Sequence, residues 1–197
     1  MNIQMKPMGS YQTNCYILTV EGKDFIIDPG INAFPWIKAH TTNPVAILNT
    51  HGHFDHVWSN QEVKEHFKIP IYCPKGDENF LSDDLFGQGT PPSEADYIIE
   101  GTQTLTIKGV EFTFLHFPGH TPGCSMIQYK DHIFSGDFIF HGSIGRYDFP
   151  LSNPEHMKES LERFMALDFD ATLYPGHGLK TTIAQEQKNT PFWLQNF

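Results

Sequence analysis

The sequence predicts a single-domain α/β or α+β protein in which helices pack outside β-sheets. Three observations lead to this prediction. The chain has 197 residues, an ordinary size for one hydrophobic core. Short runs of β-branched and aromatic residues recur along it, and segments with helical spacing follow several of them. Pairs of alternating runs joined by two-residue turns indicate antiparallel hairpins among the strands.

The first half of the chain alternates strands and helices. Each expected strand is short, rich in β-branched or aromatic residues, and bounded by turn residues. The expected order is strand 14–20, strand 23–30, helix 34–40, strand 45–50, helix 57–67 and strand 69–73. Residues 74–96 are rich in Gly, Pro and acidic side chains. They predict a short helix and an irregular surface loop, which could act as a lid.

The second half contains more hairpins. The expected elements are a hairpin at 104–117, a hairpin at 124–137, a helix at 153–167, a strand running into a loop at 171–178 and a short helix at 182–188. In the hairpins, Lys108-Gly109 and Lys130-Asp131 separate alternating runs. Asn153 can cap the long helix, and Pro154 suits its first position. The expected apolar face of this helix consists of Met157, Leu161, Phe164 and Met165.

Composition and charge exclude several classes of function. A hydrophobic content of 39% supplies ample core material and argues against disorder. The net charge of -10, without any basic cluster, disfavours a nucleic-acid partner. No secretory signal and no apolar run of membrane-spanning length is present, so a cytoplasmic location and no membrane partner are expected. The cysteines are widely separated and are expected to be buried reduced thiols: Cys15, Cys73 and Cys124.

The stretch THGHFDH, residues 50–56, concentrates three histidines and one aspartate between an expected strand and an expected helix. In an extended chain His51, His53 and Asp55 would share one side and His56 would point away. All four converge only if the chain curls near Asp55, which indicates a strand-loop-helix junction. Neutral imidazole and carboxylate are ligands of zinc and of non-haem iron. Four such residues at this spacing have no ordinary packing role, so the cluster predicts metal binding.

Three later residues are candidate ligands as well. His120 in FPGHTPG, Asp137 in FSGDFIF and His177 in YPGHG each lie at a turn after a strand-like run. Side chains from such turns can gather at one edge of a sheet. Each of these three residues would be an ordinary turn residue on its own. The four ligands of the first loop, however, could supply half of the donors that two metal sites need, and the remaining donors must then come from elsewhere in the chain. His141, close to Asp137, stays open, and the other histidines are interpreted as surface or packing residues.

The motifs THGHFDH, PGHTPGC, SGDFIF and YPGHG, in this order, resemble those of the metallo-β-lactamase superfamily. The stretch GSIGRYDFP is similar to the corresponding segment of small glyoxalase-II-like hydrolases. The resemblance spans roughly residues 14–178 and implies a four-layer αβ/βα sandwich over residues 1–197, with metals at one edge of two sheets. Full-length glyoxalase II also has a C-terminal helical domain that helps to bind glutathione. No such domain is expected here, because twenty residues follow His177.

The resemblance also implies a set of ligands. The first metal would be held by His51, His53 and His120, the second by Asp55, His56 and His177, with Asp137 bridging both. Two divalent ions are expected, zinc foremost, with iron and manganese as alternatives. Asp28 in IIDPG matches a position that supports the metal loops through hydrogen bonds. An aspartate that opens the Pro29-Gly30 turn is an equally good explanation of Asp28.

The expected activity is hydrolysis of a thioester or related ester by a metal-bridging hydroxide, available at neutral pH because the metals lower the pKa of water to about 7. Asp55 or Asp137 would orient this nucleophile. S-lactoylglutathione is the leading substrate, and other thioesters or esters remain open. By resemblance, Arg146 falls where a basic residue contacts glutathione, and Tyr147 is a weaker candidate for substrate binding. Both residues could instead have only surface or packing roles.

Two other activities compete with this interpretation. A persulfide dioxygenase of a related family would use one iron and O₂ at a subset of the same positions, and a lactonase would use the same fold. The commonest β-lactamases have cysteine where this sequence has Asp137. A diiron electron carrier is disfavoured, because Phe54 and Asp55 do not match the glutamate that such relatives usually have in the first motif. Metal analysis with substrate assays separates these possibilities, and the sequence does not indicate an oligomeric state.

Overall fold

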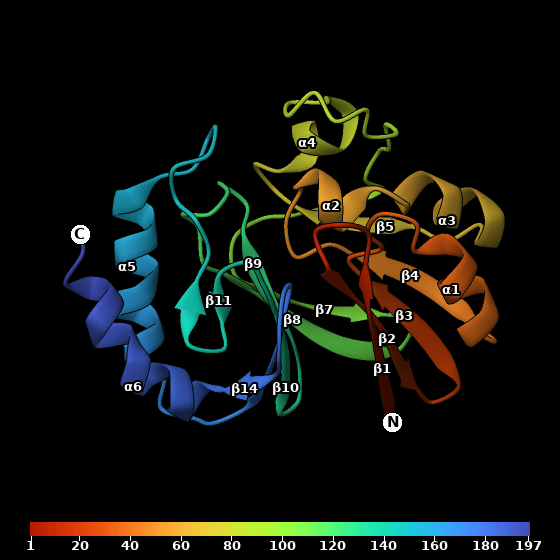
Figure 1. Cartoon of the computed structure of the whole chain (residues 1–197). Coiled ribbons are helices and arrows are strands. Elements are labelled where there is room, and N and C mark those ends of the chain that lie inside the picture. The colour runs from red at the N-terminus through yellow and green to blue at the C-terminus, as the bar shows by residue number, and fades with distance from the viewer.

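Two six-stranded sheets form the centre of the computed structural model, which describes residues 1–197 (Figure 1). The first sheet contains, in spatial order, β1 (Asn2–Met8), β2 (Thr13–Val20), β3 (Lys23–Ile27), β4 (Pro44–Leu48), β5 (Ile71–Pro74) and β6 (Tyr97–Ile99). The second contains β14 (Thr181–Thr182), β13 (Thr172–Pro175), β10 (His132–Gly136), β9 (Ser125–Tyr129), β8 (Val110–His116) and β7 (Gln103–Ile107). A separate two-stranded ribbon pairs β11 (Ile139–Phe140) with β12 (Ser143–Ile144).

Helices cover the outer side of each sheet (Figure 1). Those on the side of the first sheet are α1 (Phe34–His40), α2 (Phe54–Val57), α3 (Asn60–Phe67) and α4 (Glu78–Ser82). Those on the side of the second sheet are α5 (Pro154–Met165) and α6 (Ile183–Leu194). The layers therefore follow the order helix, sheet, sheet, helix. This confirms the α/β class and the four-layer sandwich.

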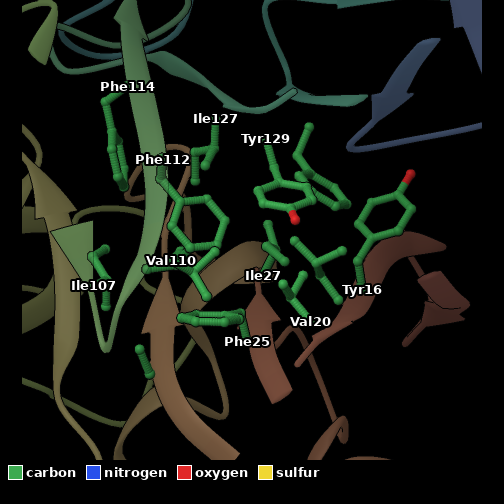
Figure 2. Close-up of a cluster of buried hydrophobic side chains, with 14 of the residues drawn as sticks. Tyr16, Val20, Phe25, Ile27, Ile107, Val110, Phe112, Phe114, Ile127 and Tyr129 are labelled. Atoms are coloured by element: carbon green, nitrogen blue, oxygen red, sulfur yellow. The ribbon is translucent and has the colours of Figure 1, made fainter. Parts of the chain in front are cut away.

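Three apolar clusters fill the spaces between these four layers. Successive strand residues point to opposite faces, and both faces of the central strands are apolar because both are covered. In β3, Phe25 and Ile27 enter the cluster between the sheets, whereas Ile26 enters the cluster beneath α1 and α3. Figure 2 shows the central cluster, in which the ring centroids of Phe25 and Phe112 are 4.8 Å apart. The third cluster packs α5 and α6 on the second sheet.

Most expected elements are present, and the turn and cap residues act as predicted. Lys108 and Gly109 both have positive φ, at 52° and 83°, as a tight hairpin turn requires. The Asn153 side chain accepts a hydrogen bond from the backbone N–H of His156 at 3.0 Å and so caps α5. The prediction for Met165 was wrong: it is 37% exposed, whereas the other three residues of the expected face are buried.

Other differences have identifiable causes. Strand β1 was not predicted, because an edge strand that is mostly exposed needs no apolar run; its seven pairs with β2 hold it in place. The helix expected at 57–67 is two helices, since the chain begins to coil at Phe54 and leaves the helical pattern at Trp58 and Ser59. Helix α6 is longer than predicted and continues through Pro191 to Leu194.

No helix has both the length and the apolarity that crossing a membrane requires. The three cysteines are buried and unpaired, as predicted.

Candidate metal centre

All seven predicted donors lie close together at one edge of the sandwich, and two of them, Asp55 and His56, belong to α2. The chain leaves β4 at Leu48, passes through a short loop and begins α2 at Phe54, so the first motif folds as a strand-loop-helix junction. His120 lies in the loop between β8 and β9, Asp137 directly follows β10, and His177 lies two residues beyond β13. Strand ends from both sheets therefore bring together residues that are far apart in sequence.

The donors form two groups joined by one carboxylate. We call His51, His53 and His120 the first triad and Asp55, His56 and His177 the second; within each, the ligand atoms lie within 4.8 Å of one another. Asp137 lies between them. Its Oδ1 is 3.2 Å from Nε2 of His56, and its Oδ2 is 3.5 Å from Nε2 of His120 and 3.4 Å from Nε2 of His177. Such an arrangement suits two cations that share a bridging ligand.

Unpaired imidazole nitrogens show that this donor set fits metal ions. The Nε2 atoms of four buried histidines lack any hydrogen-bond partner: His51, His53, His56 and His120. A buried polar atom without a partner costs about 1–3 kcal/mol, so several in one place need an explanation. Metal coordination supplies it, because histidine ligands commonly bind the metal through one ring nitrogen while the other is held by the protein.

The protein holds the second ring nitrogen of four of the five histidine donors: His51, His56, His120 and His177. Nδ1 of His51 lies 3.0 Å from Oγ1 of Thr50, and Nδ1 of His120 lies 2.7 Å from the carbonyl oxygen of Arg146. Nδ1 of His56 lies 3.0 Å from Oδ2 of Asp28, and Nδ1 of His177 lies 3.1 Å from the carbonyl oxygen of Tyr11. These contacts aim each Nε2 at the centre of the site.

Asp28 accepts hydrogen bonds from the loop that carries His51 and His53, and its backbone has a positive φ of 49°. Its Oδ1 accepts the backbone N–H of Thr50 at 2.8 Å, and its Oδ2 accepts the Thr50 hydroxyl at 2.6 Å. Asp28, His51 and His56 also lie close enough together to form a third donor group. Because both oxygens of Asp28 are already occupied, we assign it to holding His56 and the loop rather than to a cation.

Electrostatics differ between the two triads. Burial lowers the pKa of His51, of His120 and of His53, the last to about 3, so the first triad is neutral and ready to bind metal. In the second triad, burial lowers the pKa of His177, but hydrogen bonds to Asp137 and Asp55 outweigh burial and raise it to about 9. The carboxylates of Asp55 and Asp137 therefore favour protonation of His177, whereas the three histidines of the first triad stay neutral.

Comparison with known proteins identifies the family. The sequence pattern of the family described as the Metallo-beta-lactamase superfamily matches residues 8–177. The chain belongs to this superfamily. It is 36% identical to the "Probable metallo-hydrolase YqgX" of Bacillus subtilis (strain 168), over 98% of this chain and 97% of that protein. It is 35% identical to the "Hydroxyacylglutathione hydrolase GloC" of Haemophilus influenzae, over 98% of each chain.

Solved structures agree with this assignment. The chain superposes on the crystal structure of the BLEG-1 B3 metallo-beta-lactamase with a TM-score of 0.88 at 33% identity, covering 97% of this chain and 99% of that one. TTHA1623, solved in a di-iron-bound form, gives 0.83 at 31% identity, with 96% and 99% covered. The protein is thus a metallo-hydrolase of the metallo-β-lactamase superfamily, and its His/Asp cluster supports a dinuclear metal site.

The superfamily site is held together by contacts between the sheets that the sequence did not reveal. The backbone N–H of Asn14 donates to the carbonyl oxygen of Gly176 at 2.7 Å, and its side chain donates to that of Pro175 at 3.0 Å. The Thr13 hydroxyl donates to Oδ2 of Asp55 at 2.6 Å. Strand β2 of the first sheet therefore fixes both the loop that carries His177 and the orientation of Asp55.

Asp77, which lies outside all of the sequence motifs, ties the loop of His51 and His53 to the loop of His120. Its carboxylate is fully buried and accepts three hydrogen bonds. The donors are the backbone N–H of Gly52 at 2.8 Å, the Thr121 hydroxyl at 2.6 Å and the backbone N–H of Gly123 at 2.6 Å. Gly52 lies between two ligands and Thr121 directly follows His120, so Asp77 sets the spacing within the first triad. Only the three-dimensional fold brings these segments together, and the local sequence gives no signal.

The pH dependence of stability gives a test of this buried carboxylate. Burial outweighs the three hydrogen bonds and raises the pKa of Asp77 from 3.8 to about 6. Between these values the folded protein holds more protons than the unfolded chain, so the contribution of Asp77 to stability falls as the pH rises. We expect the free energy of unfolding of the wild type to fall relative to Asp77→Asn by about 2 kcal/mol from pH 4 to pH 7. Urea titrations of both metal-free proteins across this range measure the difference, and a constant difference contradicts the assignment.

The remaining candidates lie outside the two triads. Arg146 is exposed and pairs through two hydrogen bonds with Asp148, at 2.9 and 2.8 Å, while its backbone oxygen holds His120. The Tyr147 ring packs against Phe197, with centroids 4.6 Å apart. His141 is exposed at the turn of the β11–β12 ribbon and belongs to neither triad. The substrate-binding roles of Arg146 and Tyr147 stay predictions.

Proposed function

We propose that this protein hydrolyses thioesters or related acyl esters at a centre of two divalent cations, with S-lactoylglutathione as the leading substrate. The observation that carries the proposal is the pair of donor triads joined by Asp137 at one edge of the sandwich. The Haemophilus relative named as a hydroxyacylglutathione hydrolase supports the choice of substrate. Zinc is the proposed metal, although the same donors suit iron and manganese. A reducing compartment such as the cytoplasm fits the three free thiols.

Each side chain has a proposed role. His51, His53 and His120 would hold one cation, Asp55, His56 and His177 the other, and Asp137 would bridge them. The bound cations supply Lewis acidity and make hydroxide available at neutral pH. Asp55, held by Thr13, and Asp137 orient the nucleophile and accept its hydrogen bonds. The His177 side chain is 30% exposed, whereas the first triad is almost fully buried, so the substrate approaches over the second triad.

No side-chain nucleophile is required. Cys124 is the cysteine nearest in sequence to a ligand loop, but it is fully buried, and burial raises its pKa well above the usual range, so it stays a thiol at neutral pH. Replacement of Cys124 by serine therefore leaves the hydrolytic mechanism available.

Metal quantification combined with turnover tests the proposal. We expect about two divalent ions per chain, hydrolysis of S-lactoylglutathione, loss of turnover on chelation and recovery when zinc is added back. The same preparation is offered glutathione persulfide while oxygen uptake is recorded. One iron per chain with oxygen consumption and no thioester hydrolysis would overturn the proposal in favour of a persulfide dioxygenase. Cys124→Ser serves as the control and is expected to keep turnover within about threefold, since no covalent intermediate forms on it.

A further inference from the structure

Five aromatic side chains border the metal centre, and we call them the aromatic collar: Tyr11, Phe54, Phe86, Phe140 and Phe149. Four of them form a continuous series of ring contacts, with centroid distances of 5.1 Å for Tyr11–Phe54, 5.7 Å for Phe54–Phe86 and 6.0 Å for Phe86–Phe149. Phe140 lies 5.9 Å from the ring of His177. Tyr11 is exposed and the four phenylalanines are half-buried, so the collar presents apolar surface to solvent beside the donors.

Phe86 occupies the central place in this collar. Its ring stands edge-on to His53 of the first triad at 5.1 Å, and it also touches Phe54 and Phe149. It comes from the irregular loop after α4, within the Gly-, Pro- and acid-rich segment 74–96 that was expected to form a short helix and a surface loop. Asp84 instead closes its own loop by accepting the backbone N–H groups of Gln88 at 2.9 Å and Gly89 at 2.6 Å. The loop therefore contributes a ring, and not a charge, to the site.

The positively charged side chain next to the aromatic collar, that of Arg146, is already paired with a carboxylate. The Arg146 guanidinium lies 4.3 Å from the ring centroid of Phe149, where it stacks on the aromatic face. Its Nε and one terminal nitrogen are bound to the two oxygens of Asp148. A substrate carboxylate would have to displace Asp148 to reach Arg146. An apolar group meets no such competitor, and its contact with the rings removes apolar surface from water.

We propose that the aromatic collar selects thioesters with an aromatic or other bulky apolar acyl group, and that Phe86 is the residue that determines this specificity. The inference rests on the proposed hydrolytic function. It departs from S-lactoylglutathione, whose lactoyl group is small and polar, by naming apolar acyl groups as the preferred substrate class of the same site. In the reaction, water adds to the acyl carbon, the carbon–sulfur bond breaks, and the thiolate leaves with the electron pair and takes up a proton. The products are a carboxylate with an apolar substituent, a free thiol and one released proton.

A matched pair of substrates tests this specificity. The phenylacetyl and acetyl thioesters of N-acetylcysteamine share one uncharged thiol and differ in a single phenyl ring. We expect kcat/KM of the metal-loaded wild type to be at least about 10-fold higher for the phenylacetyl thioester. In Phe86→Ala this ratio falls to within about threefold of one, and in Phe86→Tyr it is kept. Leu85→Ala is the matched control: Leu85 is the neighbouring residue of the same loop, 44% exposed and outside the collar, so its ratio stays that of the wild type.

Binding of analogues that cannot be hydrolysed measures the contribution of the aromatic collar to affinity independently of catalysis. The 2-phenylethyl and ethyl thioethers of N-acetylcysteamine replace each acyl carbonyl by CH₂, and NMR titration of the same four proteins gives their Kd values. Metal content is measured for each variant, so that loss of a cation is not mistaken for loss of the collar. A preference for the phenylethyl thioether that depends on Phe86, without hydrolysis of either thioester, supports the collar and overturns the hydrolytic function. Hydrolysis without any preference, or a preference that Phe86→Ala leaves unchanged, overturns the collar alone.

Discussion

Replacement of Asp137 by alanine is expected to remove at least one of the two metal ions per chain and to lower kcat/KM for thioester hydrolysis by more than about 10²-fold. Loss of a residue that only supports a ligand typically costs 10–100-fold, and under the proposed function Asp137 would itself be a ligand of both cations. Its two oxygens lie 3.2–3.5 Å from the Nε2 atoms of His56, His120 and His177. Without this carboxylate the two triads no longer share a ligand.

The electrostatic consequence points in the same direction. Burial alone would raise the pKa of Asp137, but the neighbouring His56 and His177 lower it well below its usual range, so the carboxylate is ionised at any working pH. Alanine removes one negative charge from between two cations and leaves them to repel each other across the site. The first triad loses least, because its three histidines are neutral and two of them, His51 and His120, are held by other residues.

Metal analysis of the purified variant and steady-state kinetics measure these effects, and circular dichroism reports whether the fold is kept. Asp131→Ala is the matched control. Asp131 lies on the turn that opens the same strand, β10, and its side chain is 77% exposed. It is expected to keep two metals and wild-type turnover. If Asp137→Ala also bound two metals and turned over at the wild-type rate, a bridging role for Asp137 would be excluded.

The sequence predicted those parts of the molecule that depend on local patterns. The strands buried on both faces, the Lys108-Gly109 turn and the Asn153 cap follow from neighbouring residues, because periodicity and backbone preference act over a few positions. The histidine cluster is also a local pattern, because four such side chains in one loop have no ordinary packing role and therefore indicate metal binding. The layer arrangement came from resemblance to a family, since spacing alone left α/β and α+β open.

The supports of the site were not predictable, because they are contacts between distant segments. Asp77 looks like an ordinary turn residue of an acidic stretch, and only the fold places it against the loops of His53 and His120. Asn14 contacts a loop that lies more than 150 residues away. Phe86 stands among Gly, Asp and Gln in a segment without periodicity, so nothing in the pattern assigns its ring to the metal centre. A single sequence therefore reveals the candidate metal ligands, but it does not reveal the residues that hold those ligands in position.

Gly176→Ala is expected to disrupt the metal centre, because the added methyl group would clash with two of the donor residues. A Cβ atom at this position would collide with Oδ1 of Asp137 and would come within 2.6 Å of Cε1 of His56. The backbone has no freedom to retreat, because the N–H of Gly176 donates to Gly136 at 2.8 Å and its carbonyl oxygen accepts from Asn14 at 2.7 Å. The methyl group must therefore displace the bridging carboxylate or a ligand imidazole. We expect loss of at least one metal per chain and a fall in kcat/KM of at least about 10²-fold, together with about 1–3 kcal/mol of lost stability from overpacking.

Gly178→Ala distinguishes this steric effect from a general loss of backbone freedom. Gly178 has φ of 78°, and a Cβ there would meet no atom within 4 Å. Alanine in this left-handed conformation costs roughly 1–2 kcal/mol without touching a donor. Both variants should therefore unfold at lower urea concentration than the wild type, but only Gly176→Ala should lose metal. Equal metal content in the two variants would show that the close approach of Gly176 to Asp137 and His56 does not govern the geometry of the site.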